Sequence, residues 1–294
     1  MKKSKIIGLS LISALLVFSL TNVSHAAAPP SYAGINIGDS YTWTATANMA
    51  NINSSAIGVI GAENWTMTYN MLDELIFNAT AIHIGSLLAG GMKVSIKNFT
   101  EEVPYMWDEP RYVGVFAEIK VSYVPDVWIM VEDGLSYPSF MIVNPADINE
   151  TSYFYLFSMP LFLPLGLDFG QIASWITSNI TGLEPIYNNV TITGLSNGFR
   201  ATVLGSFLEW ALANLFGAPF PITNLDDVVA EVKWNSKGVL SSVSLKYGGL
   251  TLVTAKLHTK ADEIPGYFLP VFLVVSAIAI IGTISIIRMK KQII

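Results

Sequence analysis

The sequence contains no cysteine, only three histidines and few charged residues, which make up 13% of its 294 positions. Without cysteine the chain has no disulfide bond, no thiol nucleophile and no cysteine metal ligand. One histidine lies in the N-terminal leader, which leaves His83 and His258, so we expect no zinc site. A glycine-rich phosphate loop is also lacking, and we expect no cofactor.

Basic residues are scarce between positions 27 and 263. Six of the 16 Lys and Arg residues lie in the two terminal segments, which carry no Asp or Glu, so the central region holds 10 basic and 22 acidic residues, a net charge of −12. Such an acidic balance argues against nucleic acid as a partner, because nucleic acids are bound by neutralising phosphates. Aromatic residues reach 12%, too many for a disordered stalk.

The N-terminus has the pattern of a secretory signal peptide. Lys2, Lys3 and Lys5 precede an apolar run over 6–20, and small residues flank His25. We therefore expect residues 1–26 to be a signal peptide cleaved after Ala26. An uncleaved anchor helix is the alternative, which the shortness of the apolar run disfavours.

The C-terminus predicts a single membrane span. Residues 267–287 form a run of 21 positions without a charge, and Arg288, Lys290 and Lys291 follow at once. A helix of that length crosses the hydrocarbon core, and the basic tail belongs in the cytoplasm. We expect residues 264–294 to anchor the chain in the plasma membrane and residues 27–263 to form one extracellular ectodomain.

The start of this span carries a short motif, Ile264-Pro265-Gly266-Tyr267. Followed by an apolar span and a basic terminus, it resembles the Pro-Gly-Phe type of C-terminal sorting signal in archaeal surface proteins, including those of Asgard archaea. The resemblance implies that Pro265, Gly266 and Tyr267 form a recognition motif, and that an archaeosortase can exchange the tail for a lipid. Retention of the helix is the alternative.

The ectodomain is rich in N-glycosylation sequons, the pattern Asn-x-Ser/Thr. The seven acceptors are Asn53, Asn64, Asn78, Asn98, Asn149, Asn179 and Asn189. Their number exceeds chance and favours a glycosylated exported protein, although some of them are polar residues of turns and strands.

Alternation of apolar and polar residues dominates the ectodomain and predicts strands over 41–46, 65–70 and 117–123. A meander over 230–257 is predicted by turns at 235–238 and at Gly248-Gly249. We expect an α+β fold: a largely antiparallel sheet with two or three helices packed on one face, plus the C-terminal transmembrane helix.

Two helices are predicted, the first beginning at a capping box formed by Asp168 and Gln171, the second covering about 203–216. Between the strands and these helices, residues 151–167 are apolar and uncharged, and two prolines exclude a regular spanning helix. This stretch is interpreted as a core loop, the lining of an apolar ligand cavity, or a contact patch for a membrane or partner. The residues expected to line such a cavity are Phe154, Phe157, Leu161, Phe162, Phe207 and Trp210.

Catalytic patterns are weak. Residues 194–198 match a nucleophile elbow around Ser196, with Asp226 and His258 following in the order of a hydrolase triad. An elbow needs a strand–turn–helix within a parallel sheet, whereas Asn197-Gly198 is typical of a hairpin turn. Calcium binding by loop carboxylates remains an alternative, but no regular acidic spacing supports it. We expect no catalytic residue and no metal ligand.

The leading hypothesis is a non-enzymatic, N-glycosylated protein of the cell surface, with a binding or structural role among other surface proteins. The second hypothesis is an extracytoplasmic carrier of a lipid or other apolar ligand. A serine esterase is the third and weakest.

Overall fold

The computed structural model describes residues 27–63, 65–67, 69–70, 73–74, 89–104, 110–124, 127–134, 136–157, 161–181, 188–216 and 224–258. The expected signal peptide, the expected span over 264–294, the motif Pro265-Gly266-Tyr267 and the acceptors Asn64 and Asn78 lie outside these ranges. None of the helices in the described ranges is long and apolar enough to cross a membrane.

The described part of the chain is built on one antiparallel sheet of eleven strands. The strands are β1 (Ser40–Ala47), β2 (Ala89–Phe99), β3 (Val103–Pro104), β4 (Arg111–Val124), β5 (Val127–Glu132), β6 (Phe140–Val143), β7 (Val190–Leu195), β8 (Gly198–Val203), β9 (Val228–Trp234), β10 (Leu240–Tyr247) and β11 (Leu250–His258). Their order is β3-β4-β2-β1-β11-β10-β9-β8-β7, and β5 and β6 also pair with β4. The largely antiparallel α+β fold is therefore confirmed, and β11 lies near the middle of the sheet.

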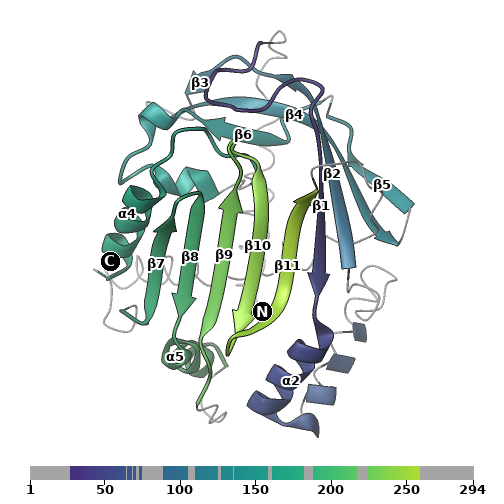
Figure 1. Cartoon of the computed structure of the whole chain (residues 1–294), viewed down its shortest axis with the longest axis vertical. Helices are drawn as coiled ribbons and strands as arrows, with labels where there is room; N and C mark the ends of the chain where they lie inside the picture. The colour runs from purple at the N-terminus through teal and green to yellow at the C-terminus, as the bar shows by residue number, and fades with distance from the viewer. Residues whose placement is uncertain are drawn as a thin grey trace, which may run out of the picture.

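The sheet is accompanied by the α-helices α2 (Met49–Ile60), α4 (Phe169–Thr181) and α5 (Gly205–Phe216), and further helical residues follow α2. Short 3-10 helices η3 (Pro145–Asp147) and η4 (Tyr153–Phe157) follow β6. Figure 1 shows α4 beside β7, while α2 and α5 lie together at the lower end of the sheet. The backbone N–H of Gln171 donates to Asp168 Oδ1 at 2.9 Å, which confirms the predicted start of α4.

The strand predicted over 65–70 is wrong. The described residues there are helical, and Trp65 N–H donates to Gly61 O at 3.0 Å. Trp65 and Tyr69 alternate with polar residues, but they are also four apart, and their ring centroids lie 5.8 Å from each other on one helix face. A short apolar alternation is compatible with both periods, and here the helical one applies.

The core lies on the inner face of a curled sheet and includes the apolar stretch after β6. Phe162 is 1% exposed, and its ring centroid lies 5.2 Å from that of Phe140 on β6 and 6.0 Å from that of Trp43 on β1. Because β6 and β1 are three strand spacings apart, about 14 Å on a flat sheet, their convergence on one ring requires the apolar face to be concave. Figure 1 shows β2, β4 and β5 turning away from the wall formed by β1 and β7–β11.

The N-terminal segment and the apolar stretch complete this core. Ala33 and Ile35 are buried, and Leu165 N–H donates to Tyr32 O at 2.8 Å. The indole N–H of Trp43 donates to Leu240 O at 2.6 Å, so the largest core side chain leaves no buried donor unsatisfied. Leu156, Leu161, Phe162 and Leu163 are all buried in the same cluster. For these residues, the core-loop interpretation of the stretch is confirmed.

Candidate functional site

The outer, convex face of the sheet differs sharply from the core in composition. Along β1, Trp43 and Ala45 are buried, whereas Thr42, Thr44 and Thr46 point to the opposite face. Successive side chains of a strand alternate between faces, so the cross-strand register places every other residue of the neighbouring strands beside these threonines. We call this surface, formed by β1, β2, β4 and β7–β11, the convex face.

Basic side chains stand in rows across this face. In the first row, Thr42 lies between Lys93 of β2 and His258 of β11, and Lys93 in turn lies opposite Lys120 of β4. In the second row, Thr44 is followed by Lys256, Ser242 and Lys233 on β11, β10 and β9. Together with Arg200 of β8, these residues extend across seven strands, from β4 to β8, or about 29 Å at the usual strand spacing.

Charge is segregated onto the convex face. Seven of the ten basic residues between positions 27 and 263 lie there, together with only two acidic residues of the described strands. The basic residues are Lys93, Lys97, Lys120, Arg200, Lys233, Lys246 and Lys256; the acidic ones are Glu118 and Glu231. A region with a net charge of −12 therefore presents one positively charged face.

Each of the two carboxylates on this face is shared by two cations. Glu118 contacts Lys120 at 2.7 Å and Lys97 at 3.2 Å, and the hydrogen bonds from these two amines hold the pKa of its carboxyl below the usual value. Glu231 contacts Arg200 at 2.7 Å and Lys233 at 3.1 Å, and these contacts lower its pKa in the same way. Both carboxylates therefore remain ionised at neutral pH.

Three cations of the face remain without such a partner. Among the described residues, Lys93, Lys246 and Lys256 form no ion pair. Lys93 and Lys256 are exposed, and Lys93 stands directly opposite Lys120. Like charges opposite each other on neighbouring strands destabilise a sheet. The arrangement costs stability and leaves charge available for an external anion.

Hydroxyl groups fill the space between the cations. Thr46 and Thr254 are hydrogen-bonded at 2.9 Å, Ser40 and Ser95 at 3.2 Å, and Thr44 contacts the imidazole of His258. Hydroxyls donate readily to sulfate, phosphate and carboxylate oxygens, so they complement the amines chemically. The surface offers charge and hydrogen-bond donors over a wide area.

The hollow of about 410 Å³ that the described residues form lies away from these lysines. It is lined by Thr46, Ala47, Asn48, Met49, Thr251, Leu252 and Thr254, where β1 and β11 meet the start of α2. On β2 the Trp128 ring lies over Gly91, about 3.0 Å from where a side chain on that glycine would begin, and covers this part of the face. None of the seven basic residues lines the hollow, so an anion would meet them on the strand surface itself.

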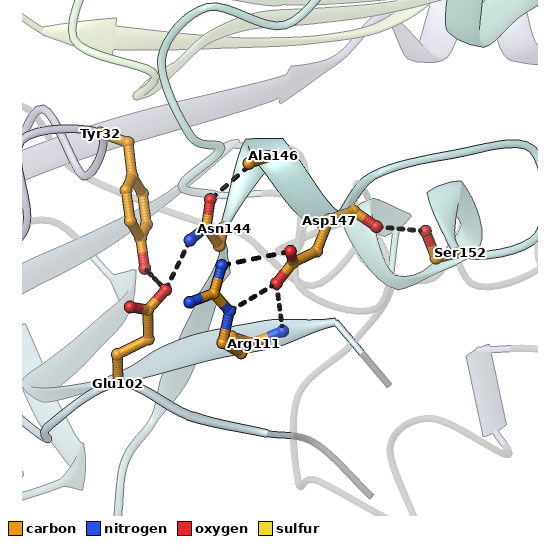
Figure 2. A network of polar contacts seen from close by, with 7 residues as sticks. All are labelled: Tyr32, Glu102, Arg111, Asn144, Ala146, Asp147 and Ser152. Atoms are coloured by element: carbon orange, nitrogen blue, oxygen red, sulfur yellow. Dashed lines mark hydrogen bonds and ion pairs between the residues drawn. The ribbon is translucent and has the colours of Figure 1, made fainter. Parts of the chain in front are cut away.

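A separate polar network ties together the opposite end of the sheet (Figure 2). Arg111 forms a two-pronged contact with Asp147, through its Nε at 3.0 Å and its Nη2 at 3.3 Å, and lowers the pKa of that carboxyl. Glu102 accepts from the Tyr32 hydroxyl at 3.0 Å and from the Asn144 amide at 2.7 Å. Burial, and then the Glu102 contact, raise the Tyr32 pKa.

This network joins segments rather than exposing unsatisfied groups. It connects the N-terminal segment, the β3 region, β4, and the chain between β6 and η4. Ser152 donates to Asp147 O at 2.9 Å and completes the connection to the apolar core stretch. The role of this polar network is to fix the fold at this end of the sheet. No three His, Cys, Asp or Glu side chains within the described ranges converge as metal ligands would.

The described sequons differ in what their acceptor amides contact. Asn149 is exposed, and its Oδ1 accepts from Thr151 N–H at 2.9 Å, from the Thr151 hydroxyl at 2.8 Å and from Ser152 N–H at 3.2 Å. These contacts all use the oxygen and leave the amide nitrogen, to which a glycan is attached, facing solvent. Asn149 thus has the most accessible geometry of the described acceptors.

The other described acceptors are more constrained. Asn53 is half-buried in α2 and accepts from Trp65 Nε1 at 3.0 Å. The amide nitrogen of Asn179 donates to the Tyr153 hydroxyl at 3.2 Å. Asn98, at the bulge between β2 and β4, accepts from the next residue's N–H, and Asn189 is half-buried beside β7. Among the five described acceptors, Asn149 is exposed and bonded only through its oxygen, whereas the others are half-buried or, at Asn179, bonded through the amide nitrogen.

The residues expected to line an apolar cavity do not share one site. Leu161 and Phe162 lie in the core cluster, which does not include Phe207. Phe207 is buried on α5, where its ring centroid lies 5.6 Å from that of the half-buried Trp210. The side chains of Phe154 and Phe157 lie outside the described part of the structure.

The hydrolase pattern is not assembled. Ser196 is exposed at the tip of the β7–β8 hairpin, next to the Leu195–Gly198 pair, as the hairpin interpretation predicts. Asp226 precedes β9 at the far end of the same strands, and its N–H donates to Tyr247 rather than facing Ser196. His258 contacts Thr44 on the convex face, four strands from β7.

The alternation in β1, and that at Glu118, Lys120 and Ser122 in β4, can be recognised in the sequence. The sequence does not show that the polar faces of these strands adjoin in the sheet. Lys93 and Lys256 are 163 positions apart, and only the register through β1 brings them together. The signal that could have found them is the rarity of basic residues combined with their placement at polar positions of predicted strands.

No known protein family matches the chain, and neither does any curated protein.

Proposed function

We propose that the chain is an exported, N-glycosylated protein of the cell surface that binds anionic ligands through the convex face of its ectodomain. Residues 1–26 direct export, residues 27–263 fold outside the cell, and residues 264–294 hold the chain at the plasma membrane. The observation that carries the proposal is the collection of seven basic residues on one face of an otherwise acidic region.

The electrostatics of this face support binding rather than stability. Glu118 and Glu231 neutralise part of the charge, but Lys93 and Lys256 stay exposed and without an ion pair among the described residues. Charges of one sign clustered on a surface attract ligands of the opposite sign and speed their association. A protein with no ligand for this face would gain stability from replacing Lys93, which stands opposite Lys120.

The carrier hypothesis receives less support. Residues of the apolar stretch that would have lined a cavity are packed against the protein's own core, around Phe162. No described observation favours the esterase hypothesis, since Ser196, Asp226 and His258 lie apart. A purely structural surface-layer role remains distinct from binding: it requires purified ectodomains to assemble into ordered arrays without an added anion.

Retention on a charged matrix tests the proposal. The full chain, purified in a neutral detergent, is applied to immobilised dextran sulfate and to uncharged dextran. We expect retention on the sulfated matrix alone, and elution by salt. Lys93→Glu and Lys256→Glu should each elute at lower salt than the wild-type chain.

The matched control for these variants is Lys237→Glu. Lys237 is exposed in the turn between β9 and β10, outside the convex face, and its reversal changes the net charge by the same amount. If all three variants elute alike, net charge governs retention and the convex face is not the binding surface.

The topology has its own test in the intact mass of the chain extracted from membranes. We expect an N-terminus at Ala27. The mass also distinguishes a retained span ending at Ile294 from a tail exchanged for a lipid near Pro265.

A further inference from the structure

The convex face also lies close to the point where the chain leaves the sheet for its expected anchor. The last described residue is His258 at the end of β11, and it belongs to the first row, with Thr42, Lys93 and Lys120. β11 is a central strand, flanked by β1 and β10. The connection to the anchor therefore starts in the middle of the basic surface, not at an edge of the sheet.

The connection is short. The uncharged span begins at Tyr267, nine residues after His258, and nine residues reach at most about 30 Å when fully extended. Lys93 stands two strands from His258, or about 10 Å. The first row is thus held within reach of the membrane surface.

From this placement we infer that the anionic ligand of the convex face is the headgroup layer of the protein's own membrane, and that the ectodomain docks on it through Lys93, Lys256 and their neighbours. The inference rests on the proposed function, which requires only that the face binds anions. It adds the identity of the partner: anionic phospholipid headgroups, contacted in cis.

Charge complementarity gives this docking a direction. The mature region carries a net charge of −12, so an anionic membrane repels most of its surface. Amines attract anionic headgroups over roughly a Debye length, about 8 Å at physiological ionic strength. The basic groups of the convex face come within that range when the face turns toward the bilayer. The tether supplies proximity, and the convex face supplies the only strongly basic surface in the described strands.

The shape and chemistry of the face fit a layer of headgroups. A convex surface spanning seven strands has no enclosing walls for a single small anion, but its amines and hydroxyls can each meet a different phosphate. Exposed Lys93 and Lys256 stand on either side of the Thr42 and Thr44 pair in β1. Docking would place the C-terminal end of β11, with His258, beside the lipid.

Lysine footprinting of the full chain in nanodiscs tests the inference. One copy of the protein is placed in discs of phosphatidylcholine alone or of phosphatidylcholine with phosphatidylglycerol, and amines are acylated and quantified by mass spectrometry. We expect Lys93 and Lys256 to be acylated several-fold more slowly in the anionic discs. The protection should disappear in about 1 M salt, where the Debye length is about 3 Å.

Lys237 is the internal control, because it is exposed and lies outside the convex face. Its acylation rate should be the same in both kinds of disc. A single copy per disc excludes contact with a second copy of this chain as the source of protection. Equal rates for Lys93 and Lys256 in the two kinds of disc would overturn docking on the membrane.

A third arm separates this inference from the proposed function. Dextran sulfate is added to the phosphatidylcholine discs as a soluble polyanion. If the polymer protects Lys93 and Lys256 while anionic discs do not, the face binds anions but not its own membrane, and a soluble or cell-surface acidic polymer becomes the ligand. If neither protects them, the anion-binding function fails as well.

Discussion

At the scale of single residues, Lys93 shows most clearly that the convex face is not arranged for stability. It faces Lys120 across the β2–β4 pair, while Lys120 is already held by Glu118. Replacing Lys93 by an acidic residue converts a like-charge pair into an attractive one. Stability and binding should then change in opposite directions.

We therefore predict that Lys93→Glu raises the free energy of unfolding by a few tenths of a kcal/mol, the usual size of such cross-strand pairs, while weakening binding to dextran sulfate. Chemical denaturation and affinity measurements on the same preparation check both effects. Lys237→Glu is the control and should change neither by as much. A variant that loses stability along with binding would mean that Lys93 has a structural role.

The Arg111–Asp147 contact predicts a pH dependence. Arg111 lowers the pKa of Asp147 in the folded chain, so the contact stabilises the fold at pH values above the ordinary aspartate value near 3.8. As the pH falls through the lowered folded pKa, Asp147 is protonated and that stabilisation is lost. The Arg111→Gln variant should therefore melt at a lower temperature than the wild-type chain at pH 7, and the difference should shrink in acid, once the pH falls below the lowered pKa of Asp147.

Thermal unfolding followed by circular dichroism at the two pH values checks this prediction. Lys237→Gln, which removes an exposed charge from a turn, is the control and should show little change at either pH. A difference for Arg111→Gln that persists unchanged at low pH would assign its effect to lost packing of the side chain instead.

The sequons also divide at the residue scale. Asn149 has an open amide nitrogen, whereas the amide nitrogen of Asn179 is hydrogen-bonded to Tyr153. We predict that Asn149 carries a glycan in the largest fraction of molecules among the described acceptors. Glycopeptide mass spectrometry measures this occupancy directly, and Asn149→Gln should remove one glycan mass from the intact chain. A higher occupancy at Asn53 or Asn179 would show that modification precedes the folded geometry.

At the scale of elements, the apolar stretch after β6 belongs to the core of the fold. Phe162 contacts Tyr41, Trp43 and Phe140, from two strands of the sheet. Phe162→Ala should lower the free energy of unfolding by about 3–5 kcal/mol, the range for truncating a buried phenylalanine. Leu167→Ala, at a half-buried position of the same stretch, should cost less. Denaturant unfolding compares the two.

A small loss of unfolding free energy in Phe162→Ala would contradict the core assignment. It would favour the alternatives, in which the stretch lines an apolar ligand cavity or forms a contact patch. Should Phe162→Ala fail to fold, Phe162→Leu keeps the test available, because it leaves most of the apolar volume in place and should cost less than the truncation.

The sequence predicts those elements whose local signals agree with one another. The β9–β11 meander follows from the turns at 235–238 and Gly248-Gly249, and both glycines of the second turn adopt positive φ, which glycine tolerates. The start of α4 follows from the Asp168 cap. The helical residues around Trp65 and Tyr69 were predicted as a strand, because three apolar positions over six residues do not separate the two periods.

The candidate site could not be predicted in the same way, because it depends on pairing between distant strands. Lys93, Thr42 and Lys256 become neighbours only after β1 inserts between β2 and β11. Alternation along one strand tells which residues share a face of that strand. The order of strands in the sheet, and hence which faces adjoin, is set by the whole chain.

At the scale of the whole molecule, the two faces of the sheet differ in polarity, and the convex face differs in charge from the rest of the chain. The curled sheet encloses an apolar core on its concave face and presents a basic convex face, while residues 27–263 as a whole are strongly acidic. An anion that spans the face should contact several cations at once. Binding to such polyanions releases counterions and therefore weakens steeply with salt.

The salt dependence of dextran sulfate binding tests this claim most directly. The affinity of the full chain is measured by titration at several salt concentrations, alongside the Lys93→Glu/Lys256→Glu double variant. We expect the logarithm of the affinity to fall steeply and linearly with the logarithm of the salt concentration. The slope should be smaller by about 1 to 2 in the double variant, because each cation removed from the contact lowers the number of counterions released. A slope unchanged in the double variant, or no binding by the wild-type chain at low salt, would contradict it.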